Sequence, residues 1–310
     1  MSLRSIPVMI VGLGLLMGRP SQGSAQLGDT GSFLAHVSNE YTVIPNITYH
    51  VASGHENKLD LYLPRTVTGP TPLLLYIHGG GWVGGAKEVN VLRILPYLEM
   101  GWAVANVEYR LGAVARAPAA VEDGLCALRW IIQNADEYNV DTSQIVTSGN
   151  SAGGHLALTT AMIPSSAGLG RECPGREELS VSAIVNWYGI TDVGDLLDGP
   201  NIKSYAVEWM GSLEGRFDIA ERVSPMTYVR PGLPPTLTIH GDADPTVPYQ
   251  HAINLHEQLD TVGVPNALHT VPGGGHGGFN REEMLAAFGV IHQFLSEHVT
   301  GTGMAAAPRR

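Results

Sequence analysis

The sequence is short of cysteine, of charge and of basic residues in particular, and each shortage excludes a class of protein. Only 2 of its 310 residues are cysteines, which is too few for a disulfide-rich scaffold. Charged residues make up 15%, while the apolar share of 44% excludes a disordered chain. Lys and Arg number 18 against 29 Asp and Glu, a formal net charge of −11. Such a surface repels phosphate backbones, so nucleic acid is not expected as a partner.

A long hydrophobic run is also missing. The uncharged apolar run at residues 6–17 would rise about 18 Å as a helix, well short of the ~30 Å hydrocarbon core. Small residues at 23–25 follow it, so residues 1–25 are predicted to be a secretory signal peptide, with a membrane anchor as the alternative. We expect a secreted or periplasmic protein that makes no membrane contact after cleavage. Outside the cytoplasm Cys126 and Cys173 could form a disulfide, and the sequence leaves their state open.

Short apolar runs alternate with helix-like segments over the rest of the chain. Strands are expected at residues 57–63, 72–77, 102–109, 144–148, 181–188, 236–240 and 267–271. Helices are expected at residues 118–138, 152–162, 249–262 and 282–298. The first strand alternates as an antiparallel one should, whereas the continuous runs suit a parallel sheet buried on both faces. We predict a doubly wound α/β fold and one domain over residues 26–310, with a small cover at 191–234 and a frayed tail at 300–310.

Four loops after expected strands carry unusual residues, at the sheet edge where parallel folds bind ligands. The first, residues 149–153, reads Gly-Asn-Ser-Ala-Gly and matches the G-x-S-x-G nucleophile elbow between a strand and a helix. So sharp a reversal strains the backbone of Ser151 and requires small neighbours, which the two glycines provide. Ser151 is therefore the candidate nucleophile, the alternative being a serine that only caps the helix.

The second loop is rich in glycine and permits two interpretations. Residues 78–82 read His-Gly-Gly-Gly-Trp, and their backbone amides suit an oxyanion that develops on a carbonyl oxygen. The first and third glycines, with Gly84, also satisfy the dinucleotide pattern G-x-G-x-x-G, and Glu108 would be the ribose-binding acid. The export signal and the separate elbow favour the oxyanion loop, because a dinucleotide enzyme needs neither. His78 is expected to shape the loop, and Trp82 to bind substrate in the acyl pocket or else to be core.

The third and fourth loops supply an acid and a base. After residues 236–240, Asp244 is preferred over Asp242 because it lies further into the loop and precedes a proline that keeps its backbone extended. Of the 12 histidines, His276 lies in a glycine-rich loop where its ring can transfer protons. Metal binding is the alternative, but no further ligand stands at metal-site spacing, so no metal is predicted. The order Ser151, Asp244, His276 is that of α/β-hydrolases.

With these loops in place, the chain resembles an α/β-hydrolase of the lipase/esterase group that carries HGGG and G-x-S-A-G-G motifs. Four other segments are similar to bacterial secreted acetyl esterases and feruloyl esterase-like enzymes, namely residues 59–64, 108–111, 187–192 and 224–228. The resemblance implies an oxyanion hole formed by Gly80, Gly81 and Ala152, and its G-x-x-D-x-x-V-P pattern again selects Asp244. Hormone-sensitive-lipase-like members have a substantial N-terminal helical cap, whereas here the segment before Asn57 is short and strand-like. We therefore expect an open cleft with a small lid or none.

These expectations converge on a serine carboxylic ester hydrolase that works through an acyl-enzyme and needs no cofactor. The expected partners are small or polymer-borne esters, with short-chain acyl or feruloyl groups on plant polysaccharides as the leading substrates. A polyester hydrolase or a broad lipase-like carboxylesterase is the first alternative. A serine peptidase or a non-catalytic binding module on the same fold remains a further one.

Overall fold

The computed structural model describes residues 29–212 and 214–301. The predicted signal peptide, residues 1–25, lies outside the described residues, as does nearly all of the tail predicted at 300–310. No helix within the described residues is both long enough and apolar enough to span a lipid bilayer.

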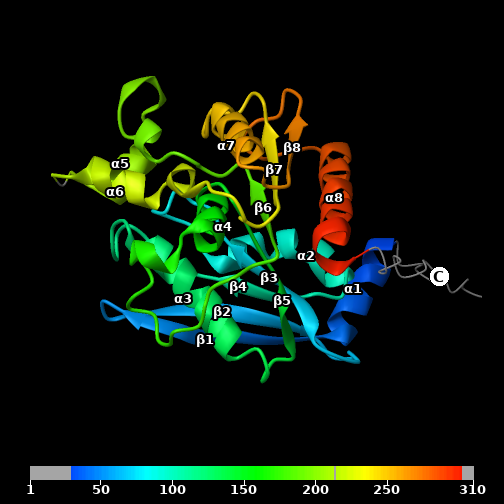
Figure 1. Ribbon diagram of the computed structural model, residues 1–310. Coiled ribbons are helices and arrows are strands. Elements are labelled where there is room, and N and C mark those ends of the chain that lie inside the picture. Colours follow the sequence, from blue (N-terminus) through cyan, green and yellow to red (C-terminus); the bar gives the residue numbers. More distant parts are fainter. Residues whose placement is uncertain (1–28, 213, 302–310) are drawn as a thin grey trace, which may run out of the picture.

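The described residues form an eight-stranded sheet at the centre of the protein (Figure 1). Its strands are β1 (Tyr41–Ala52), β2 (His55–Pro64), β3 (Thr71–Ile77), β4 (Ala103–Val107), β5 (Val140–Asn150), β6 (Ala183–Trp187), β7 (Thr236–Gly241) and β8 (Asn266–Val271). Their order across the sheet is β1-β2-β4-β3-β5-β6-β7-β8. β2 pairs antiparallel with β1 and with β4, and all other neighbours are parallel. The predicted sheet, parallel with an antiparallel start, is confirmed.

Helices cover both faces of this sheet. The α-helices are α1 (Asp29–Glu40), α2 (Val91–Glu99), α3 (Ala119–Gln133), α4 (Ala152–Met162), α5 (Ser204–Met210), α6 (Arg216–Val223), α7 (Gln250–Thr261) and α8 (Arg281–Leu295). Leu73 and Leu75 of β3 pack into the core under α3 and α4, whereas Leu74 and Tyr76 pack into the core under α2 and α8. Because strand side chains alternate between faces, a sheet buried on both sides requires the continuous apolar runs seen in the sequence.

Two helices were not expected from the sequence. The segment before Asn57, expected to be only strand-like, contains α1, whose weakly periodic sequence is held by packing of Val37 on the core. α2 contains Pro96, which cannot donate a backbone hydrogen bond and usually ends a helix. The carbonyl of Leu92, four residues earlier, therefore has no amide donor within the helix. Because Leu92 is 78% exposed, water can donate a hydrogen bond to that carbonyl instead.

Residues 191–212 and 214–234 form a small cover. It contains α5 and α6, together with the 3-10 turns η3 (Gly194–Leu196), η4 (Gly199–Asn201) and η5 (Pro225–Tyr228). α5 and α6 lie together at the upper left of Figure 1. Trp209 of α5 stacks on Trp82, with ring centroids 4.1 Å apart, and the carbonyl of Val223 accepts a hydrogen bond from His155. The cover is therefore anchored in the core of the domain.

A disulfide joins Cys126 of α3 to Cys173 in the segment between α4 and β6. The structure thus settles a pairing that the sequence left open. Arg129, one turn along α3, donates hydrogen bonds to the carbonyl oxygens of Gly170 and Cys173. The bridge and these bonds fix the irregular segment against α3.

Candidate active site

The predicted nucleophile lies in a sharp turn at the carboxyl end of β5. Ser151 has φ 56° and ψ −123°, a conformation that residues with a side chain rarely adopt. Its amide donates to the carbonyl of Trp187, and α4 starts at the next residue. A Cβ on Gly153 would overlap the carbonyl oxygen of Ile77, and one on Gly149 would overlap the carbonyl of Gly153. Both glycines are thus required because backbone passes directly beside them.

Ser151, His276 and Asp244 lie in one hydrogen-bonded chain. His276 Nε2 lies 2.8 Å from Ser151 Oγ, and His276 Nδ1 lies 2.7 Å from Asp244 Oδ2. Because a carboxylate can only accept a hydrogen bond, Nδ1 of His276 carries the ring proton and donates a hydrogen bond to Asp244. Nε2 is then free to accept from the serine hydroxyl. The structure brings together three residues that the sequence separates by 125 and 32 positions.

Asp244 is held ionised by its surroundings. Its side chain is fully buried, and burial by itself raises the pKa of a carboxyl group. Hydrogen bonds from His240 and His276 outweigh that effect, with help from the amide of Val247, and hold the pKa of Asp244 well below its ordinary value. Oδ1 accepts from the amides of Thr246 at 2.7 Å and Val247 at 3.0 Å, while Oδ2 faces the two histidines.

His240 is a site residue that sequence reasoning missed. It is fully buried at the end of β7, with Nε2 3.1 Å from Asp244 Oδ2 and 3.2 Å from the carbonyl of Val247. Since both of these oxygens accept, Nε2 carries the proton and donates to them. The one sequence signal for this role was its position, since His240 stands four residues before the expected acid Asp244. Within the described residues no group of three or more His, Cys, Asp and Glu is arranged to hold a metal ion.

The glycine loop after β3 lies between the elbow and the cover. Gly80 and Gly81 have φ 122° and 60°, and no hydrogen bond from their amides, or from that of Ala152, is found among the described residues. A Cβ on Gly81 would lie 2.8 Å from the Cβ of Tyr205. The loop turns back on itself, and the next α-helix begins only at Val91. The dinucleotide interpretation requires a helix N-terminus directly after the glycine loop, and none is found there among the described residues.

Trp82 does not fit the predicted role in substrate binding. It has no exposed surface, because it stacks on Trp209 and donates from Nε1 to His155 Nδ1 at 3.1 Å. Trp82 is instead a core residue, which was the alternative interpretation of the sequence. Tyr205 of α5 instead lies beside Gly81 and donates from its hydroxyl to the carbonyl of Thr246 at 3.1 Å. This tyrosine spans from the glycine loop to the loop of Asp244, and the sequence contained no signal for it.

Two further residues have the structural roles expected of them. His78 is buried, and its Nδ1 lies 2.7 Å from the carbonyl oxygen of Gly79 in the same loop. Asp242 accepts from the amide of Gly273 at 2.6 Å, so it ties the acid loop to the histidine loop. Neither side chain contacts Ser151, His276 or Asp244 among the bonds of the described residues.

The sheet topology and the elbow together define an α/β-hydrolase. More narrowly, the chain belongs to the BD-FAE family, whose model matches residues 59–259. Among curated proteins it is similar to Esterase LipC of Mycobacterium tuberculosis, with 29% identity over 68% of this chain and 54% of that protein. The chain spans little more than half the length of the curated relatives it matches first.

Two solved structures are similar over nearly their whole length. A truncated carbohydrate esterase from gut microbiota has a TM-score of 0.70 and 28% identity, covering 82% of this chain and 97% of that one. Esterase 2 of Thermogutta terrifontis, solved with propionate bound, has a TM-score of 0.71 and 26% identity, covering 87% of this chain and 97% of that one. Both belong to the class that the sheet and the elbow define.

Proposed function

We propose that this protein is a serine carboxylic ester hydrolase, with Ser151 as nucleophile, His276 as general acid and base, and Asp244 as the residue that orients the ring. The observation that carries the proposal is the hydrogen-bonded chain from Ser151 Oγ through His276 to Asp244. The strained elbow, which holds Ser151 at the N-terminus of α4, supports the same role. The esterase relatives support an activity of this kind.

Acylation follows from the donor and acceptor roles in the triad. Ser151 attacks the ester carbonyl carbon while His276 Nε2 takes its hydroxyl proton. Asp244 stabilises the resulting imidazolium because its depressed pKa keeps it ionised. The bond between the carbonyl carbon and the alcohol oxygen then breaks, and His276 protonates the leaving alcohol. Water, deprotonated by the same ring, attacks the acyl-enzyme and releases the acid, and none of these steps uses a metal or an organic cofactor.

The amides of Gly80, Gly81 and Ala152 are proposed to stabilise the negative charge on the carbonyl oxygen. Two of them stand in the loop packed against the elbow, where a Cβ on Gly79 would lie 3.3 Å from the Cβ of Ser151. The third opens α4, where the helix dipole adds to the attraction. Amides without an intramolecular partner can bind the oxyanion without first breaking another bond.

Short-chain acyl and hydroxycinnamoyl esters are the proposed substrates, with alcohols as bulky as a plant polysaccharide. A small cover in place of a large cap supports bulky alcohols, and so does the carbohydrate esterase among the similar structures. The propionate-bound relative supports a short acyl group. We further propose export from the cytoplasm, on the evidence of residues 1–25. Fractionation of cells expressing the full chain tests it, since protein retained uncleaved in the cytoplasm would contradict it.

The catalytic assignment is tested by replacing the nucleophile. Ser151→Ala should lower kcat for p-nitrophenyl acetate by about 10⁴-fold or more, with an unchanged circular dichroism spectrum. Ser143→Ala, on an exposed part of β5, is the matched control and should retain full activity. Full activity in Ser151→Ala would overturn the assignment. A panel of acetyl, butyryl and octanoyl esters, methyl ferulate and acetylxylan then ranks the substrates.

A further inference from the structure

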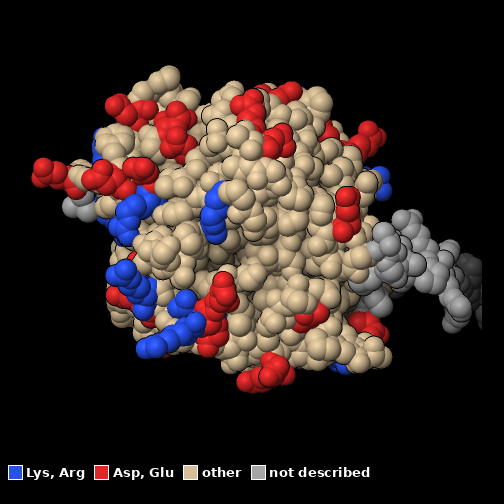
Figure 2. Space-filling view, viewed as in Figure 1, with Lys and Arg blue, Asp and Glu red and all other residues tan. Residues whose placement is uncertain are grey.

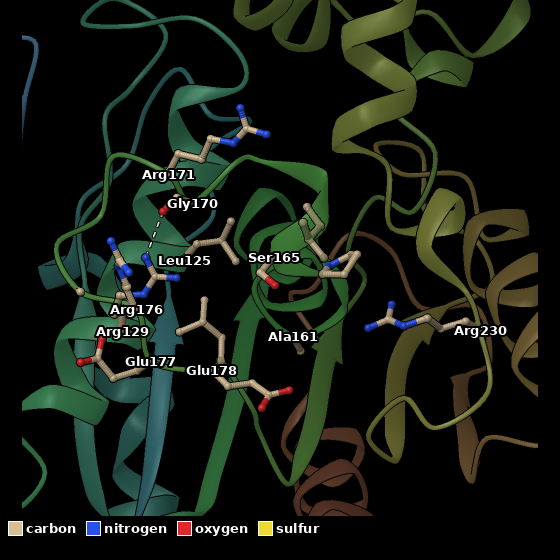
Figure 3. Close-up of a pocket in the computed structure, with 14 residues that line it drawn as sticks. Leu125, Arg129, Ala161, Ser165, Gly170, Arg171, Arg176, Glu177, Glu178 and Arg230 are labelled. Atoms are coloured by element: carbon tan, nitrogen blue, oxygen red, sulfur yellow. Dashed lines mark hydrogen bonds between the residues drawn. The ribbon is translucent and has the colours of Figure 1, made fainter.

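A pocket of about 500 Å³ lies away from the triad, at the far end of α4. Ser151 precedes the first residue of this helix, and Ala161, near its last, lines the pocket, so about 15 Å of helix separates the two sites. The disulfide-linked segment between α4 and β6 forms one wall. Figure 3 shows Arg129 and Arg176 on one side of the pocket and Arg230 on the other.

Positive charge is concentrated at this pocket in a strongly acidic protein. Four of the 18 Lys and Arg residues line it, Arg129, Arg171, Arg176 and Arg230, against two acidic residues, Glu177 and Glu178. The lining thus carries two more positive than negative charges, whereas the chain carries a net charge of −11. In the view of Figure 2 most of the basic side chains gather on the left, while acidic ones are spread around the molecule. A small anion would be attracted to this pocket and repelled from most other surfaces.

Arg129 is the most informative residue of the lining. It is only 8% exposed, yet it forms no salt bridge with any described residue, and its Nε has no hydrogen-bond partner there. Its bonds to the carbonyls of Gly170 and Cys173 satisfy only Nη1. Arg110, 4% exposed, offers a comparison within the same chain, because it is paired with Asp123 at 2.8 Å. A buried guanidinium normally needs such a carboxylate, whereas the exposed Glu177 acts on Arg129 electrostatically without forming a salt bridge with it.

Apolar side chains complete the pocket. Leu125, Ile163 and Leu179 line it, and its volume exceeds the space that a carboxylate group alone occupies. We propose that this pocket binds a small organic carboxylate, whose acid group lies beside Arg129 and Arg176 on one side of the pocket and whose apolar body rests on the leucines. The arginine fork matches a planar carboxylate, which would supply the directly hydrogen-bonded partner that Arg129 lacks. This second site is independent of the proposed esterase activity.

Calorimetric titration with benzoate and with benzamide tests the proposal, since the two probes share a shape and differ in charge. Benzoate should bind the full-length protein, and benzamide should bind at least about tenfold more weakly. Arg176→Gln, at an exposed position, should weaken benzoate binding about tenfold, as should Arg129→Lys, which loses the fork. Arg222→Gln, an exposed arginine of α6 outside the pocket, is the matched control and should bind benzoate as the unmodified protein does.

Equal affinity for the two probes, absence of benzoate binding, or binding that survives Arg176→Gln unchanged would each overturn the proposal. The last outcome would place benzoate elsewhere, for example at the triad as an analogue of the acid product. Arg176→Gln should retain full p-nitrophenyl acetate turnover because its side chain lies outside the triad and the glycine loop. This readout separates a lost carboxylate site from a lost fold, and it keeps the test valid should Arg129→Lys fold poorly.

Discussion

Replacing His240 with phenylalanine tests whether this histidine positions Asp244, the proposed acid of the triad. Phe keeps a ring of similar size but removes the Nε2 donor, which lies 3.1 Å from Asp244 Oδ2 and 3.2 Å from the carbonyl of Val247. A hydrogen bond to a charged group contributes about 1.5–3 kcal/mol. We expect the free energy of unfolding at pH 7 to fall by about that amount, because a buried carboxylate oxygen then has His276 as its remaining donor.

The kinetic consequence distinguishes positioning from a merely structural role. With Asp244 less firmly held, the ring of His276 is less well oriented, so kcat should fall about tenfold while KM stays nearly constant. His256→Phe is the matched control, since His256 is also buried, bonds through one ring nitrogen to Asn266 and has no partner for the other. It should lose stability but keep kcat.

Both quantities are measurable on one preparation, with p-nitrophenyl acetate kinetics and urea unfolding. An unchanged kcat in His240→Phe, or an equal loss of kcat in His256→Phe, would refute the reasoning. The same holds for a rise in KM at constant kcat, because that pattern reports lost substrate binding rather than a misoriented ring.

Three more predictions rest on single contacts. The pKa of Asp244 is depressed in the folded protein, so its ionised form stabilises the fold above its unfolded pKa of about 4, and this contribution disappears as pH falls through the lower folded value. The stability difference from Asp244→Asn, measured by urea unfolding, should therefore narrow as pH is lowered from about 6 to about 3. Gly81→Ala should lower kcat at least about tenfold, because φ is 60° and the new Cβ meets the cover tyrosine. Gly84→Ala is the control, since its Cβ would make only an ordinary contact, 3.8 Å from the carbonyl oxygen of Gly80; equal kcat in the two variants would contradict this prediction. Replacing Cys126 and Cys173 with alanine should cost about 4 kcal/mol in urea unfolding, since the bridge closes a separation of 47 residues, and a loss below about 1 kcal/mol would contradict a structural bridge.

The fold and the triad were both readable from the sequence, and for the same reason. A parallel sheet buried on both faces demands continuous apolar strands, and it places its ligand-binding loops at a single edge. Ser151, Asp244 and His276 follow three such strands, so recognising the strands also brought the three residues together. The glycines at 149 and 153 were equally readable, because only glycine permits the backbone contacts of the elbow. The sequence did not predict α2 because it contains Pro96, a residue that usually ends a helix. It did not predict α1 because the apolar pattern of that segment is weak.

By itself, then, the sequence determined what local rules control: the strands, the turn chemistry and the residue types available for catalysis. Only the tertiary structure decided the rest, because burial and partnership depend on segments that meet from far along the chain. Trp82 is core because α5 folds back to cover it, and Cys126 is paired because the segment after α4 returns to α3. His240 bonds to Asp244 only in the folded loop, and Nε of Arg129 has no partner among the described residues only because folding buries it away from water.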